Sequence, residues 1–132
     1  MMSITLESKK EARMKDQRNE ERVKAMIFTA VYEQKGHVLL GFLGDLTTQG
    51  AMVMGEKQIE TDRDLTLVIE FKGATEVPGG QLTLPAHVAW CKVDEDTAYY
   101  HTGFKFLELT EQDEKIIETL VARYKFSNDL LK

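Results

Sequence analysis

Two arginines four residues apart, Arg18 and Arg22, stand in the most basic part of the chain. Residues 9–24 hold seven Lys or Arg and four Asp or Glu, a net charge of +3, so the remainder carries −8 of the total of −5. Each guanidinium offers a rigid fork of N–H donors that matches a phosphate or the O6/N7 edge of guanine. The spacing therefore fits a small, localised anion site. Charge alone favours a solvent-exposed charged helix instead.

A second polar motif, Asp45-Leu46-Thr47-Thr48-Gln49-Gly50, follows some twenty residues later. An aspartate accepts hydrogen bonds from the N1–H and amino group of guanine, and a hydroxyl donates to phosphate or holds a turn. Glycine allows a backbone conformation that other residues resist. The same residue types are common in ordinary turns. Alone, the motif fits either a ligand site or a plain turn.

Motifs for catalysis and metal binding are missing from the sequence. The serines are Ser3, Ser8 and Ser127, close to the ends. There is no Gly-x-Ser-x-Gly, no phosphate-binding loop and no dinucleotide fingerprint. The histidines are His37, His87 and His101, without the spacing of metal ligands. The sequence predicts a protein that is not an enzyme and has no catalytic residue, metal or bound cofactor.

Composition indicates one globular domain. The chain has 132 residues, 42% of them hydrophobic and 30% charged. The single cysteine, Cys91, excludes an internal disulfide and a cysteine-based zinc site. No apolar run approaches the ~20 residues of a membrane span, and the polar start MMSITLESKK is not a secretory signal. We expect a cytoplasmic protein that neither enters a membrane nor coats a nucleic-acid polymer.

The elements that must position the two motifs are mostly strands. Segments rich in β-branched and aromatic residues, separated by turn signals, are Ala25–Tyr32, His37–Leu43, Ala51–Met54, Leu65–Phe71, Leu82–Val93 and Ala98–Leu109. A bulge is expected at Gly41. Six such strands favour a closed or nearly closed antiparallel barrel.

Around this barrel we predict three other parts. A helix should start at the N-cap Thr110, with acids in its first turn. Its apolar face should contain Ile116, Ile117, Leu120, Val121 and Tyr124. Residues 1–16 form a polar arm, helical from about Leu6. The barrel domain with its helix occupies 17–126, and 127–132 is a tail.

The order of the motifs resembles that of the PilZ domain family. An Arg-x-x-x-Arg segment, a strand hairpin and Asp-x-[Ser/Thr]-x-x-Gly occur in this sequence. Val88-Ala89-Trp90, Tyr100–Phe106 and the acidic helix start Thr110-Glu111-Gln112-Asp113 look like the later parts of the family. The resemblance covers about residues 14–125. It implies a six-stranded β-barrel that binds cyclic di-GMP, a bacterial second messenger.

The resemblance also implies roles for single residues. Arg18 and Arg22 would grip the phosphates and guanine edges of the ligand. Asp45 would read a guanine, Thr47 would support it, and Gly50 would shape the turn. Thr47 stands where the family usually has serine and keeps the hydroxyl. Arg13 and Gln17 are further candidates for contact, and Gln17 leaves open whether one or two ligand molecules bind.

A lone domain of this kind must act on a protein partner in trans, with motility, biofilm or exopolysaccharide control as the outputs that the resemblance implies. One alternative is a PilZ-like adaptor that binds proteins and not the nucleotide, although such adaptors typically lack the arginine pair. A flavin-holding split barrel is another, but no phosphate-cradling loop supports it. We interpret Trp90 as a core or edge aromatic rather than a platform for a base.

Overall fold

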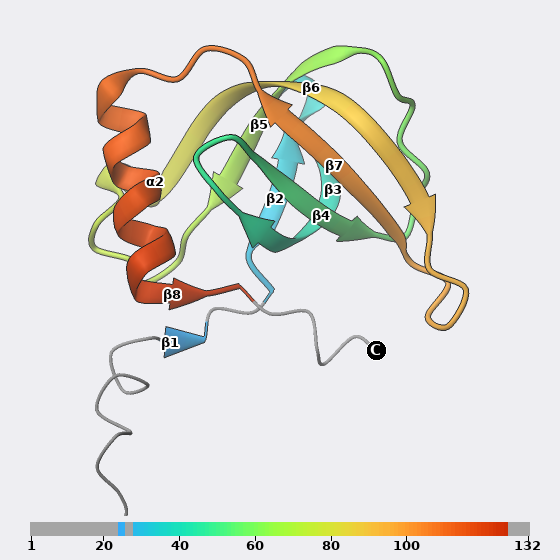
Figure 1. Ribbon diagram of the computed structural model, residues 1–132, viewed down its shortest axis with the longest axis horizontal. Helices are drawn as coiled ribbons and strands as arrows, with labels where there is room; N and C mark the ends of the chain where they lie inside the picture. Colours follow the sequence, from blue (N-terminus) through green and yellow to red (C-terminus); the bar gives the residue numbers. More distant parts are fainter. Residues whose placement is uncertain (1–23, 26–27, 127–132) are drawn as a thin grey trace, which may run out of the picture.

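A computed structural model of the protein describes residues 24–25 and 28–126. Six strands close into an antiparallel barrel in the order β2-β3-β4-β7-β6-β5 (Figure 1). They are β2 (Ala30–Glu33), β3 (Val38–Leu46), β4 (Gly50–Gly55), β5 (Asp64–Glu70), β6 (Gln81–Val93) and β7 (Tyr100–Phe106). The predicted six-stranded barrel is therefore confirmed. The predicted arm (1–16) and tail (127–132) lie outside the described residues, as do Arg18 and Arg22.

Alternation of apolar and polar residues produces the core. The inward positions of β5, Leu65, Leu67 and Ile69, are 9%, 0% and 0% exposed, and Leu84 and Val88 of β6 are fully buried. Burial of each such side chain contributes about 1.5–3 kcal/mol. The strand period therefore fixes which face of each strand points into the barrel.

The predicted first strand, Ala25–Tyr32, is wrong at its start. Phe28 has a φ of +59°, in the left-handed region, and its side chain is 52% exposed. An extended strand does not continue through a residue with such dihedrals. The barrel strand therefore begins at Ala30, and Ala25 belongs to a separate short strand, β1 (Lys24–Ala25). Gly41 was correctly expected at a bulge, because β3 has one extra residue, Leu40, opposite the Val31–Tyr32 step of β2.

The helix α2 (Glu111–Arg123) stands across the end of the barrel at which β5 and β7 end (Figure 1). The hydroxyl of Thr110 accepts a hydrogen bond from the Asp113 N–H at 3.0 Å, which confirms the predicted N-cap. Ile117 and Leu120 are fully buried in the barrel core. In the described part of the chain, no helix is both long and apolar enough to cross a bilayer.

Two residues of the predicted apolar helix face do not belong to it. Val121 is 44% exposed, because it lies one helical step away from the buried Leu120. Tyr124 has left the helix and starts the short strand β8 (Tyr124–Lys125), with φ −127° and ψ 147°. Tyr124 still packs against the core from β8, so the helix itself contacts the core through Ile116, Ile117 and Leu120.

A second, two-stranded sheet joins the two ends of the described chain. β1 pairs in parallel with β8, with Lys24 opposite Tyr124 and Ala25 opposite Lys125 (Figure 1). In the sequence, β1 starts two residues after Arg22, and β8 follows α2 directly. The arginine segment is thus connected to the barrel domain at the end of the helix.

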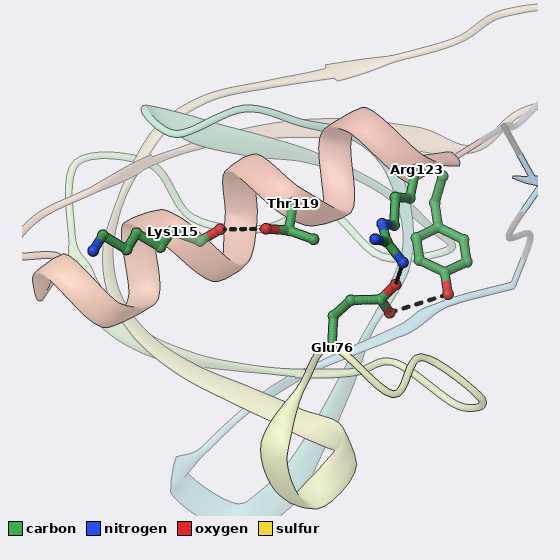
Figure 2. Close-up of polar contacts among 5 residues, drawn as sticks. Glu76, Lys115, Thr119 and Arg123 are labelled. Atoms are coloured by element: carbon green, nitrogen blue, oxygen red, sulfur yellow. Dashed lines mark hydrogen bonds and ion pairs between the residues drawn. The ribbon is translucent and has the colours of Figure 1, made fainter. Parts of the chain in front are cut away.

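Glu76, in the loop between β5 and β6, holds the end of α2 (Figure 2). Its two carboxylate oxygens accept hydrogen bonds from Arg123 Nη1 and from the Tyr124 hydroxyl, each at 3.1 Å. The Glu76 side chain is 12% exposed, whereas that of Arg123 is 64% exposed. A hydrogen bond from its own main-chain N–H lowers the pKa of Glu76; partial burial opposes this, and Tyr124 and Arg123 add to it.

The lowered pKa of Glu76 predicts a loss of stability in acid. The folded state holds this carboxylate ionised more strongly than the unfolded chain does, so its contribution is fully present above the ordinary glutamate pKa of about 4.3. It is lost as the pH falls from there through the lowered value. Denaturant unfolding of wild type and Glu76→Gln between pH 3 and 7 measures it. The stability difference between them should shrink in acid, and a constant difference would contradict the prediction.

Candidate ligand-binding cleft

An open cleft of about 780 Å³ lies on the outside of the barrel, between the β3–β4 turn and the neighbouring strands β6 and β7. The start of α2 closes one side of it. The residues that line it are Asp45, 47–52, Ala89, Trp90, 103–107, Leu109 and Glu114. Such a volume is within the range of about 300–1,000 Å³ that small-molecule sites occupy.

Asp45 reaches this cleft because of a bulge in β3. Leu43 pairs with Val53 and Asp45 with Met52, so Gly44 is an extra residue without a partner on β4. Regular alternation would point Asp45 inward like Leu43, which is 1% exposed. The bulge reverses the alternation, so that Asp45 is exposed and Leu46 is buried. One carboxylate oxygen accepts the Leu46 N–H at 2.9 Å, which fixes the side chain at the rim.

Thr47 holds the turn that follows. Its hydroxyl oxygen accepts the N–H groups of Gln49 at 3.1 Å and Gly50 at 3.2 Å, and its main-chain N–H donates to the Gly50 carbonyl at 2.9 Å. The hydroxyl hydrogen points to the Gly50 carbonyl over a long 3.4 Å. Within the protein, then, Thr47 acts mainly as an acceptor that rigidifies the turn beside Asp45.

Gly50 is required for a different reason from the one that its place in a turn suggests. Its φ is not positive, so the turn does not need glycine dihedrals. A Cβ at position 50 would instead lie 2.1 Å from the carbonyl oxygen of Phe104. Gly50 pairs with Lys105 across the β4–β7 ladder, and the two strands approach closely at the floor of the cleft. The glycine therefore permits close strand pairing rather than shaping the turn.

Trp90 also lines the cleft, whereas the sequence indicated a core or edge aromatic. Val88 pairs with Phe104 and Trp90 with Gly103, so Ala89 is an extra residue in β6. This second bulge turns Trp90 outward, to 41% exposed, where alternation would place it in the core beside Val88. Trp90 is thus an exposed aromatic of the cleft and not a core residue.

The indole of Trp90 occupies the space beside Gly103. A Cβ at position 103 would come within 2.1 Å of the indole Nε1, so only glycine leaves room for the ring. Lys92 Nζ lies 5.8 Å from the ring centroid, within the range of a cation–π contact. The sequence does contain a tryptophan and a glycine that pair across neighbouring strands, but this pairing can be recognised only once the strand register is known.

The charges of the cleft are mixed. Asp45 and Glu114 supply acceptors, and Lys105 supplies a cation opposite Gly50. Together with the exposed face of Trp90, this set matches a ligand with a flat ring, N–H donors on that ring and a negative group. Asp45, Thr47 and Gly50 all line this cleft. Arg13, Gln17, Arg18 and Arg22 lie outside the described residues.

The family model of the PilZ domain matches residues 16–123 of the chain. The chain belongs to the PilZ domain family. No curated protein sequence gives a significant match. Among solved structures, the Bacillus subtilis inhibitor of motility, MotI/DgrA, has a similar fold, with a TM-score of 0.57 at 12% sequence identity. The match covers 72% of this chain and 45% of that one, so this PilZ chain spans less than half the length of its structural neighbour.

Proposed function

We propose that this PilZ protein is a receptor for cyclic di-GMP and binds it in the cleft described above. The observation that carries the proposal is that two independent bulges, at Gly44 and Ala89, turn Asp45 and Trp90 outward into the same cleft. An acceptor for the N–H groups of guanine and an aromatic face for its ring therefore meet at one place. Family membership supports the same ligand class.

Arg18 and Arg22 supply the remaining contacts in this proposal. Glu114 lines the cleft ten residues before Tyr124, which corresponds to about 15 Å of helix. Lys24 pairs with Tyr124, and an extended segment spans up to ~7 Å from Lys24 to Arg22 and ~20 Å to Arg18. The segment from Lys24 back to Arg18 is thus long enough to reach the cleft, while the part that ends at Arg22 covers about half of the distance. Arg13 and Gln17 extend the same segment as further contacts.

The proposed receptor is not an enzyme and needs no cofactor besides its ligand. We place the protein in the cytoplasm, where its complex with cyclic di-GMP acts on a protein partner in trans. The outputs that we propose are motility, biofilm or exopolysaccharide control. The structural neighbour is an inhibitor of motility, but at 12% sequence identity the likeness concerns the fold alone.

The decisive experiment is a calorimetric titration of the full chain with cyclic di-GMP. Saturable heat with a dissociation constant in the micromolar range or below supports the receptor. Absence of heat at high micromolar ligand, with the barrel shown to be folded by circular dichroism, overturns it and favours the adaptor that binds proteins alone. Cyclic di-AMP in the same cell is the control for a general affinity for cyclic dinucleotides.

Trp90 predicts an optical signal for binding. It is the single tryptophan of the chain and 41% exposed, so a stacked base should change its fluorescence. Trp90→Ala should weaken binding about 5- to 150-fold, the equivalent of about 1–3 kcal/mol for one stacked base. Trp90→Phe, which keeps a ring, should recover most of this loss. Fluorescence that stays constant while calorimetry detects binding would contradict the role of Trp90.

A further inference from the structure

The outer face of the barrel carries its side chains in rows, because paired residues of neighbouring strands lie side by side on the same face. One row crosses β3, β4, β7 and β6 (Figure 1). In it Asp45 pairs with Met52, Met52 with Gly103, and Gly103 with Trp90. All four residues line the cleft. The strand register therefore fixes the places of the two proposed guanine contacts.

Lys105 belongs to the next row. It follows Gly103 by two positions on β7, a step of about 6.6 Å that returns to the same face of the sheet. Its side chain is exposed and lines the cleft. The indole of Trp90 lies beside Gly103, so the ring and the Lys105 side chain occupy neighbouring positions on one face. Such a separation is comparable with that between a nucleotide's base and its phosphate, which one ribose joins.

The strand partners of Lys105 leave its ammonium group available. On β4 the partner is Gly50, which has no side chain. On β6 the partner is His87, and its Nδ1 lies 2.7 Å from an Asp64 oxygen and its Nε2 3.7 Å from an Asp62 oxygen. The carboxylates nearest to this row thus contact the imidazole. Among the described residues, Lys105 forms no ion pair.

The charge of the cleft gives this lysine a further importance. Its described lining contains two carboxylates, those of Asp45 and Glu114, and Lys105 is the one basic side chain among them. Cyclic di-GMP carries two phosphate charges, which these carboxylates repel. A lysine ammonium is a compact charge with three donors and binds phosphate without the planar geometry that a guanidinium requires. The cation best placed to offset the repulsion therefore comes from β7.

We propose that Lys105 binds a phosphate of the nucleotide whose guanine stacks on Trp90, and is thus a further ligand contact supplied by the barrel itself. This inference rests on the proposed binding of cyclic di-GMP in the cleft, and it requires no contact from the arginine segment. The ammonium group donates to a phosphate oxygen, while the row through Asp45 and Trp90 holds the base.

The test compares Lys105→Gln with Lys72→Gln, which removes the same charge from the exposed β5–β6 loop, beside a different pocket. In calorimetry, Lys105→Gln should weaken binding of cyclic di-GMP at least about tenfold, the loss of one charge-assisted hydrogen bond. Lys72→Gln should change the affinity less than about threefold, through screened long-range attraction alone. Lys105→Arg keeps a charged donor and should retain most of the affinity. Both lysines are exposed, so the denaturant midpoints of all three variants should match that of wild type.

Phosphorus NMR of the bound ligand separates a direct contact from an indirect effect. In the wild-type complex, the phosphate that Lys105 binds should have a resonance shifted from that of free cyclic di-GMP. At saturating ligand, Lys105→Gln should move this resonance back toward the free position. Lys72→Gln should leave it in place.

The outcomes are distinguishable. If wild type binds and Lys105→Gln binds equally well, the phosphate contact is overturned and the receptor function stands. Equal losses in Lys105→Gln and Lys72→Gln, or a weaker Lys105→Gln with an unchanged phosphorus spectrum, also overturn the contact, because the lysine then acts through distant charge or through the fold. If wild type gives no binding, the proposed function fails and the phosphate contact fails with it.

Discussion

Replacement of Arg22 by alanine is expected to reduce the affinity for cyclic di-GMP at least about 100-fold. Each charge-assisted hydrogen bond contributes about 1.5–3 kcal/mol, and a guanidinium makes two in a bidentate contact with phosphate or guanine. Every 1.4 kcal/mol is about a factor of ten in the dissociation constant. Arg18→Ala should have a similar effect, and the double variant should give no measurable heat. Calorimetry at fixed ionic strength measures these losses.

Two further variants show whether the guanidinium itself matters. Arg22→Lys keeps the charge and loses the fork, so we expect it to recover only a small part of the affinity. Lys10→Ala removes one charge from the same basic segment without removing an arginine, and should change the affinity less than about threefold, through screened long-range attraction alone. Equal losses in Arg22→Ala and Lys10→Ala would contradict a specific role for the arginine and indicate general electrostatic attraction.

The barrel and its helix were predictable because their signals are local. Leu65, Leu67 and Ile69 occupy every second position of β5, and a strand of period two buries them on one face. Thr110 followed by acids marked the start of α2, and its hydroxyl does accept the Asp113 N–H. Such signals depend on residues a few positions apart. Long-range packing confirmed them here and did not override them.

The outward orientation of the Asp45 and Trp90 side chains could not be predicted in the same way. Both stand two positions after a buried residue, Leu43 and Val88, and alternation therefore assigns both to the core. The bulges that turn them out depend on how two strands pair, which no local pattern in β3 or β6 specifies. Asp45 was found through its motif. Trp90 was missed because its partner Gly103 is thirteen residues away.

The β1–β8 sheet was invisible to pattern reasoning for a related reason. Two-residue strands have no period to detect, and their pairing joins residues a hundred positions apart. The start of the first barrel strand was misplaced by the same lack of a signal, because the apolar run Ala25–Tyr32 gives no hint of the positive φ of Phe28. Segments that lie at the edge of the core are decided by tertiary contacts and not by composition.

Gly50 provides the second large effect, because a single methyl group there should disturb both the barrel and the cleft. A Cβ at Gly50 would lie 2.1 Å from the Phe104 carbonyl oxygen, which is main chain and cannot rotate away. Gly50→Ala must therefore push β4 from β7 at the floor of the cleft. Forced overpacking of this kind costs about 1–3 kcal/mol. We expect a lower denaturant midpoint and at least about a tenfold loss of affinity, the equivalent of one weakened charge-assisted bond.

Gly55 separates the two consequences of that change. It lies at the other end of β4, and a Cβ there would also come within 2.1 Å of a main-chain carbonyl oxygen, that of Leu40. Gly55 lines a different pocket, of about 380 Å³, away from Asp45 and Trp90. Gly55→Ala should thus destabilise the barrel as much as Gly50→Ala and change the affinity of the folded protein less than about threefold, the scatter expected for a site without direct contact. If both variants lose affinity in proportion to stability, Gly50 serves the fold alone, and the ligand-binding cleft does not depend on the close approach of β4 and β7.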